Sequence, residues 1–380
     1  MEHSAMERDR GRTAVLLGAM EATATAPARR TRLTGAMFAG ALAALALWAA
    51  PAGASTLIVE GAGDGHGVGM SQDGALGYAE HGWSDAAILA HYYAGTTLGR
   101  ASASANVKVL EGSKVVAVPL ERYVRGVVAA EMPSGWPAAA LEAQAIASRT
   151  YALTDHAGGA RFDVYSDTRS QMYESPPTPA AETATTNAAV AATAGQIVLY
   201  QGKPAITYYF ASSGGMTEDN ENSFLGSEPE PWLRGVPDSY ETKASSWKLS
   251  IGFASAAARL RGLVKGSFRG IEVLGRGVSP RIVAAEVLGS RGASPVSGPE
   301  LAARLALTST WAYFSVKSGA SVRREPDVSG QPPFAPLAPE SAPATPAPVP
   351  APAPSTGPQG GAQAPATVAS TSATGGAQAE

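Results

Sequence analysis

A long stretch without large apolar side chains limits the part of this chain that can build a folded core. From about Pro326 onward the sequence consists almost entirely of Pro, Ala, Ser, Gly and Gln, with PAPVPAPAPSTG at its centre. Such a composition buries too little apolar surface to offset the entropy of folding, and its prolines favour an extended form. The sequence therefore predicts a disordered Pro/Ala-rich tail over 326–380.

The other end of the chain carries the pattern of an export signal. An arginine-rich segment ending at Arg32 precedes an apolar run over 35–50, and Ala-Gly-Ala follows at 52–54. This is the order of a signal peptide, and the apolar run is shorter than the ~20 residues of a membrane-spanning helix. We therefore expect a signal peptide over 1–54, export to the cell envelope or the extracellular side, and no membrane span after its cleavage.

Composition excludes several classes of function for the remaining 55–325. The formal net charge is -3 and charged residues make up 16% of the chain, so no basic field is present to hold a nucleic acid. The absence of cysteine excludes disulfides, thiolate nucleophiles and zinc sites built on Cys. The histidines have no HxH or HxxxH spacing, and no G-x-S-x-G motif marks a serine hydrolase. We expect no metal and no cofactor.

Short β-rich runs and helical stretches follow one another without regular βαβ alternation. This order favours an α+β fold with mixed β-sheets and a few helices over a doubly wound sheet. The helices are expected at 70–80, at 85–93 after the N-cap Ser84, and from Pro137 to Gly158-Gly159. The strands are expected at 107–110, 115–118, 196–200, 205–210, 271–273 and 282–287.

The most informative block is VPLERYVRGVVAAEMPSGWPAAALEAQAIASRTYAL, at 118–153. Its small apolar residues lead to one carboxylate, Glu131, where Met132-Pro133 forces the backbone out of a helix. Burial among apolar residues raises the pKa of a Glu and keeps it protonated near neutral pH, as a general acid requires. The alternative is a Glu that only pairs with an arginine of the same block, and the residues alone leave both open. The candidate arginines are Arg122, Arg125 and Arg149.

Several blocks of the chain together resemble the SpoIID/LytB family. VPLERYVRGVVAAEMP and EAQAIASRTYAL closely resemble its signature, and FDVYSDTRSQMY and the SSGG-T-E stretch at 212–218 are similar to its central region. GDGHGVGMSQDGALGYAEHGW, at 63–83, is similar to its glycine-rich block. In the family pattern this last block normally follows a phrase like LTSTWAYFSV, found here at 307–316. The resemblance thus implies a SpoIID-like domain over 55–325 with circularly permuted motif order, and predicts that a strand near 57–60 pairs close to 312–316.

The resemblance implies an exported peptidoglycan lytic transglycosylase, which cleaves the MurNAc-GlcNAc bond of glycan strands that lack stem peptides, with Glu131 as its single acid and base. A second carboxylate could come from Asp64, Glu218 or Glu221. The alternative is a non-catalytic, wall-binding enhancer of an N-acetylmuramoyl-L-alanine amidase, and a structural envelope protein is a third reading. Whether the setting is sporulation, division or wall turnover is not readable from the motifs.

Further residues that match family motifs are candidates for binding the glycan. They are His66, Gln72, Gln144, Arg149, Tyr151, Ser212, Ser213, Gly214 and Gly215. Some relatives carry Cys and His where this chain has Tyr165, Arg169 and Ser170, which cannot build a transition-metal site. Aromatic residues that could stack on sugars are Tyr92, Tyr93, Trp136, Tyr208, Tyr209 and Trp232.

Overall fold

A computed structural model describes residues 55–174, 183–241, 246–327 and 329. The expected signal peptide at 1–54 and nearly all of the expected tail lie outside these residues. Pro326 and Asp327 are described: the Pro326 carbonyl accepts from Val273 N at 3.0 Å, and Asp327 pairs with Arg276 at 2.7 Å. Among the described residues, no helix is both long enough and apolar enough to cross a membrane.

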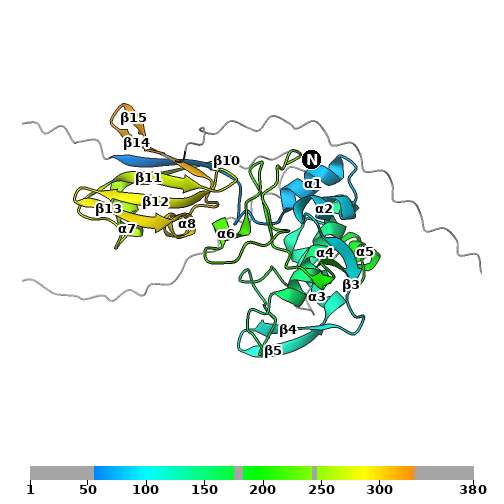
Figure 1. Ribbon diagram of the computed structural model, residues 1–380. Coiled ribbons are helices and arrows are strands. Elements are labelled where there is room, and N and C mark those ends of the chain that lie inside the picture. The colour runs from blue at the N-terminus through cyan, green and yellow to red at the C-terminus, as the bar shows by residue number, and fades with distance from the viewer. Residues whose placement is uncertain (1–54, 175–182, 242–245, 328, 330–380) are drawn as a thin grey trace, which may run out of the picture. The chain divides into compact units, whose positions relative to one another are not determined.

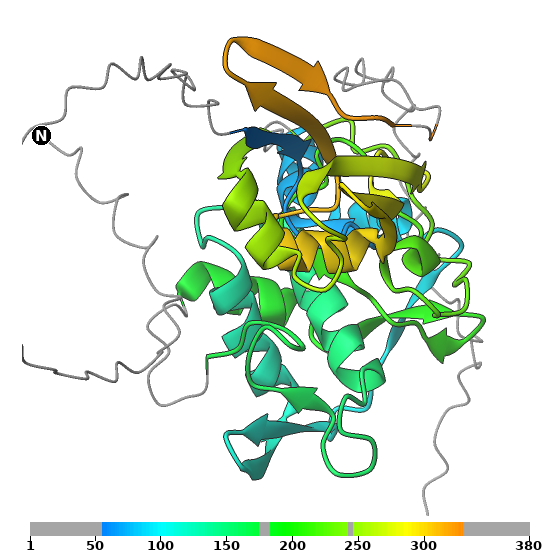
Figure 2. The same ribbon diagram turned by 90° about the vertical axis from the view of Figure 1, so that its left-hand side faces the viewer.

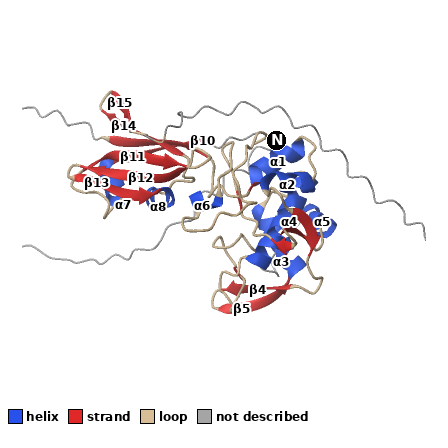
Figure 3. Ribbon diagram, in the orientation of Figure 1, coloured by secondary structure: helices blue, strands red, loops and turns tan. Residues whose placement is uncertain are grey.

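The fold is α+β, as expected, and Figure 3 shows helices and strands interspersed along the chain. The helices are α1 (Gln72–Glu80), α2 (Asp85–Tyr92), α3 (Leu120–Glu131), α4 (Ala138–Thr154), α5 (Ala184–Ala192), α6 (Asn220–Ser223), α7 (Phe253–Arg259) and α8 (Gly298–Leu305).

The strands form several small sheets. They are β1 (Thr56–Ala62), β2 (Met70–Ser71), β3 (Thr97–Arg100), β4 (Asn106–Glu111), β5 (Lys114–Pro119), β6 (Val164–Tyr165), β7 (Gln196–Tyr200), β8 (Lys203–Pro204), β9 (Tyr209–Phe210), β10 (Ser246–Gly252), β11 (Phe268–Arg276), β12 (Ile282–Gly289), β13 (Gly292–Ser297), β14 (Ala312–Ser318) and β15 (Ser321–Arg324). The sheet orders are β10-β1-β14-β15, β11-β12-β13, β3-β7-β8, β5-β4-β6 and β2-β9.

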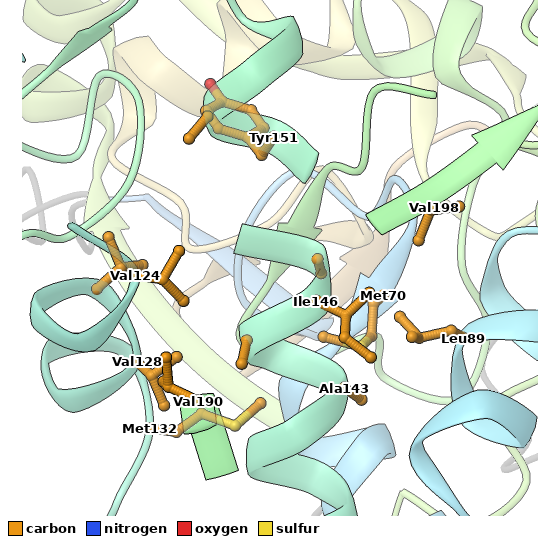
Figure 4. Close-up of a cluster of buried hydrophobic side chains, with 14 of the residues drawn as sticks. Met70, Leu89, Val124, Val128, Met132, Ala143, Ile146, Tyr151, Val190 and Val198 are labelled. Atoms are coloured by element: carbon orange, nitrogen blue, oxygen red, sulfur yellow. The ribbon is translucent and has the colours of Figure 1, made fainter. Parts of the chain in front are cut away.

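The first hydrophobic cluster is built around α4, which is rich in alanine and buried on nearly every side. Small side chains let neighbouring helices approach closely, and Ala is the best helix former. Figure 4 shows Val124 and Val128 of α3 on one side of α4, with Leu89 and Val198 on the other. The helix therefore serves as the central support for the elements that carry Glu131.

The second hydrophobic cluster joins the sheet of β1 to that of β11, with α7 and α8 packed against them. Here the N-terminal strand lies between two C-terminal strands: β1 pairs antiparallel with β10 and with β14. Leu57 lies opposite Val316 and Glu60 opposite Tyr313, so the expected pairing is confirmed. Figures 1 and 2 show blue β1 beside orange β14.

Two expected elements are shorter than the sequence pattern suggests. In the run expected as a strand at 205–210, only Tyr209 and Phe210 pair with another strand. The preceding backbone is satisfied by side chains, since Trp232 Nε1 donates to the Ile206 carbonyl at 2.9 Å and Tyr93 to the Tyr208 carbonyl at 2.8 Å. The helix after Pro137 ends at Thr154, before the glycine pair expected to stop it.

A candidate carbohydrate-cleaving site around Glu131

Glu131 is the last residue of α3, where the chain leaves the helix as expected. Met132 caps the helix with extended backbone, φ -126 and ψ 141, and Pro133 follows it. The carboxyl group is thus placed at the negative end of a helix dipole, which disfavours its ionised form. The sequence expectation of a partly buried carboxylate is met at this position, because the residue is of intermediate exposure.

Two hydrogen bonds and a third polar contact, from separate segments, surround the Glu131 carboxyl group. Met172 donates its backbone N–H to Oε1 at 2.7 Å, and Gln72 donates Nε2 to Oε2 at 3.1 Å. The Tyr209 hydroxyl lies 3.3 Å from Oε1. Burial raises the pKa of Glu131, and these donors oppose the shift without cancelling it. The group is therefore better able to hold a proton than an exposed Glu.

Uncharged side chains form hydrogen bonds with the residues that contact the Glu131 carboxyl group. The Tyr209 hydroxyl donates to Gln171 Oε1 at 2.6 Å, and Gln171 Nε2 donates to the Tyr123 hydroxyl at 3.0 Å. Gln72 Nε2 lies 3.4 Å from Gln144 Oε1. No arginine or lysine among the described residues contributes to the pKa shift of Glu131. The alternative of a Glu held by an arginine is thus not what the structure shows.

An open groove of about 540 Å³ lies beside the carboxyl group. Aromatic side chains, polar groups and one arginine form its walls, a mixture typical of carbohydrate sites, where rings pack on sugars and polar groups bind hydroxyls. The lining residues are Asp64, Gly65, His66, Gln72, Glu131, Tyr151, Thr168, Arg169, Ser170, Gln171, Met172, Tyr208, Tyr209, Phe210, Ala211 and Phe224.

Of the expected glycan-binding residues, His66, Gln72 and Tyr151 line this groove. The His66 ring packs among aromatic side chains, with its centroid 5.1 Å from that of Phe224. Burial, together with the positive charge of Arg281, lowers the pKa of His66 to about 4. The imidazole is therefore neutral at pH 7, and its Nδ1 accepts from Val68 N at 3.1 Å.

Arg149 does not line the groove, which corrects the expectation from the sequence. Its side chain is fully buried, and its guanidinium donates to both carboxylate oxygens of Glu121 at 2.8 Å. It also donates to the carbonyls of Gln196 at 3.0 Å and Ala145 at 3.3 Å. Because all of these partners belong to the scaffold, Arg149 ties α3 to α4 and β7. Gln144 is equally buried and reaches the site only through Gln72.

The SSGG turn is also packed inside the protein and does not line the groove. Ser212 and Ser213 are buried, and both hydroxyls donate to Glu241. A Cβ on Gly214 would lie 2.9 Å from the Cβ of Ala62, and Gly215 has a φ of +115. These glycines are needed for close approach and for left-handed backbone. The tight-turn interpretation therefore replaces sugar binding for these four residues.

Only one of the three candidate second carboxylates reaches the groove. Asp64 lines it, and burial raises the pKa of this residue. Glu218 is fully buried and accepts from the backbone of Val278 at 2.9 Å, and Glu221 pairs with Arg234 at 2.7 Å. The described residues contain no cluster of three or more His, Asp or Glu side chains that could hold a metal ion.

Sequence reasoning missed Gln171 and Met172 as parts of the site. Both follow the loop at 166–170, and neither a motif nor a spacing connects them to Glu131. Tyr209 was named only among the aromatic residues that could stack on sugars, whereas its hydroxyl donates to Gln171 and lies 3.3 Å from Glu131 Oε1. The pairing of β9 with β2, which places Tyr209 opposite Met70, brings this tyrosine and Gln72 to the same end of α3.

Comparisons with known proteins find relatives of the region that contains Glu131. The model of the family "SpoIID: Stage II sporulation protein" matches residues 111–200, which include Glu131. Stage II sporulation protein D of Bacillus subtilis (strain 168) is 31% identical over 153 residues, which cover 37% of this chain and 44% of that protein. The counterpart from Bacillus amyloliquefaciens is 32% identical over 170 residues, 40% and 49% of the two chains.

A further relative has a different name. The "Amidase enhancer" of Bacillus subtilis (strain 168) is 34% identical over 106 residues, 28% of this chain and 14% of that protein. The chain thus spans less than half of the length of each of these relatives. The matched region, which carries the carboxyl group beside the groove, is thus similar to the SpoIID/LytB family.

Proposed function

We propose that this chain is an exported cell-wall protein that cleaves the MurNAc-GlcNAc bond of peptidoglycan glycan strands as a lytic transglycosylase. One observation carries the proposal: Glu131 is partly buried, has a raised pKa, has no cationic partner among the described residues and borders an open groove. The family model matched at 111–200 and the names of the relatives support a role at the cell wall. The signal pattern at 1–54 supports export.

In this mechanism Glu131 acts first as an acid. Its proton passes to the oxygen that links C1 of the muramic residue to the next sugar, and the C1–O bond breaks. Oε1 already accepts the short bond from Met172 N, so Oε2, with the longer bond from Gln72, is the oxygen proposed to hold the proton. General acid catalysis of this kind contributes ~10²–10⁴ to a rate.

Glu131 then acts as a base. The carboxylate accepts the proton of the 6-hydroxyl group of the same muramic residue, and that oxygen bonds to C1 to give a 1,6-anhydro end. The carboxyl group ends the cycle protonated and no water is consumed. A second carboxylate opposite the first, which most glycoside hydrolases need, is therefore not required. Asp64 on the groove wall is available to stabilise positive charge that develops at C1.

The groove continues beyond the residues nearest to Glu131, as binding of a polymer requires. A second depression of about 200 Å³ shares Gly65 and His66 with it and extends to Pro299 of α8 and Thr308. Its lining contains no charged residue and combines hydroxyl groups with apolar side chains. This surface suits a neutral N-acetylglucosamine residue of a strand that crosses His66.

The test is digestion of purified, peptide-free glycan strands by the wild type and by Glu131→Gln. We expect anhydro-muramyl ends from the wild type and a loss of ~10²–10⁴ in rate for the variant. Gln keeps the shape of the side chain but cannot supply a proton, so binding to sacculi should persist. Equal activity of the two proteins, or the absence of anhydro products from the wild type, contradicts the proposal.

The second candidate function is enhancement of an N-acetylmuramoyl-L-alanine amidase, favoured by the name of the relative matched over 106 residues. In that case the groove binds glycan without cleaving it, and Glu131→Gln still stimulates the amidase. Measurement of amidase turnover with both proteins separates the candidates. Stimulation by both, with no glycan cleavage by either, assigns the enhancer role.

A further inference from the structure

The groove beside Glu131 has a single basic side chain in its wall. Among the lining residues, Arg169 is the one arginine, and no lysine is present. The acidic residues of the lining are Glu131 and Asp64, both with pKa values raised by burial, and Asp167 binds Arg169 from outside the lining. The electrostatic character of the groove towards a charged ligand therefore depends strongly on Arg169.

Arg169 is held in a fixed orientation although its side chain is 60% exposed. Nε and Nη2 donate to the two carboxylate oxygens of Asp167 at 2.8 and 2.7 Å, and the guanidinium lies 3.8 Å from the centre of the Tyr165 ring. The arginine in turn lowers the pKa of Asp167 to about 2, so both groups are charged at neutral pH. Such a side chain has lost part of its rotamer entropy before any ligand arrives.

The two bonds to Asp167 leave some of the N–H donors of the guanidinium unused. A guanidinium has five N–H donors, and no acceptor among the described residues bonds to Nη1 of Arg169. Planar donor pairs of this kind recognise carboxylates and phosphates. The same loop supplies the Met172 N–H that binds Glu131, so the donors of Arg169 and the proposed acid belong to one short segment.

Only one component of a glycan strand matches this chemistry. N-acetylglucosamine is neutral, whereas N-acetylmuramic acid carries a lactyl ether that ends in a carboxylate when no stem peptide is attached and in an amide when one is. We propose that Arg169 binds the lactyl carboxylate of a muramic residue in the groove, and that this contact makes the site select peptide-free strands. The inference rests on the proposed function, because it concerns the substrate of the same site.

The experiment measures binding in the absence of cleavage. The full chain with Glu131→Gln is titrated with a peptide-free GlcNAc-MurNAc tetrasaccharide and with the same sugar after its lactyl carboxylates are reduced to alcohols. We expect about two- to fivefold tighter binding of the carboxylate form, the range of one solvent-exposed ion pair, and a loss of this preference at high salt. Arg169→Gln in the same background should bind both sugars equally, and Arg169→Lys should retain part of the preference.

Arg161→Gln is the matched control, because Arg161 is also exposed and is absent from the groove wall. It should leave the preference unchanged while removing the same charge. If the Arg169→Gln protein still prefers the carboxylate form, or if the starting protein has no preference, the inference is wrong. A wild type that binds with this preference but cleaves nothing refutes the proposed activity and leaves the Arg169 contact standing. A wild type that cleaves glycan but has no preference for the carboxylate form refutes the Arg169 contact and leaves the proposed activity standing.

Discussion

Replacement of Arg149 by methionine separates a structural role from a substrate-binding one. The change removes a fully buried guanidinium that binds Glu121 through two bonds of 2.8 Å and the carbonyl groups of neighbouring elements. Removal of one partner of a buried ion pair costs ~3–5 kcal/mol. The Glu121 side chain is 40% exposed and regains water, so we expect the lower end, about 3 kcal/mol.

The assay is urea unfolding followed by circular dichroism, combined with glycan binding in buffer. For a slope of about 2 kcal/mol per molar urea, this loss lowers the midpoint by roughly 1.5 M. Arg149→Lys keeps the charge without the paired donors, so its urea midpoint should lie between those of the wild type and Arg149→Met. Binding of peptide-free strands by the folded variant should be unchanged. An unchanged midpoint with lost binding refutes the structural role and restores Arg149 as a glycan contact.

Three further predictions concern other parts of the molecule. Because its pKa is raised in the folded state, Glu131 favours folding below the ordinary pKa of Glu and loses that contribution as pH rises through the raised value. Glu131→Gln should therefore gain stability relative to the wild type as pH rises above the ordinary Glu value of 4.5, and a gap that shrinks in that direction contradicts the burial argument. Asp238 is buried, and burial together with Glu241 raises its pKa from 3.8 to about 7. Asp238→Asn should therefore remove a loss of stability that develops as pH rises between these two values, and an unaltered pH profile of unfolding would refute this. Thr308→Arg, in the second depression, should slow cleavage of long strands but not of a tetrasaccharide. Ala303→Arg, at an exposed position on α8, is the control. Equal effects of Thr308→Arg on both substrates argue against a continuous groove.

The local elements could be predicted from the sequence because their signals are local. Ser84 caps α2 through a bond to Ala87 N, and the valine-rich runs on either side of Gly112 form the β4–β5 hairpin. The position of Glu131 at a helix end followed directly from Met132-Pro133. The pairing of β1 with β14 was predictable only because the order of the family motifs implied it. The circular permutation itself stays a prediction.

The remainder of the site depends on contacts between distant segments. Arg149 and Ser213 are polar residues in blocks that resemble the family's motifs, and nothing local indicates that Glu121 and Glu241 bind them inside the protein. Gln171 reaches the site through tertiary packing, 40 residues of chain after Glu131, without a spacing rule. Burial therefore decides which polar residues of a motif face a ligand, and burial is a property of the whole fold.

The central claim is that Glu131 transfers a proton and that no water enters the product. Digestion of peptide-free strands in water enriched in oxygen-18, followed by mass spectrometry of the new ends, tests it most directly. The account predicts 1,6-anhydro-muramyl ends without the heavy isotope for the wild type, and none of these products for Glu131→Gln. Reducing ends that carry oxygen-18, or undiminished anhydro products from the variant, would contradict it.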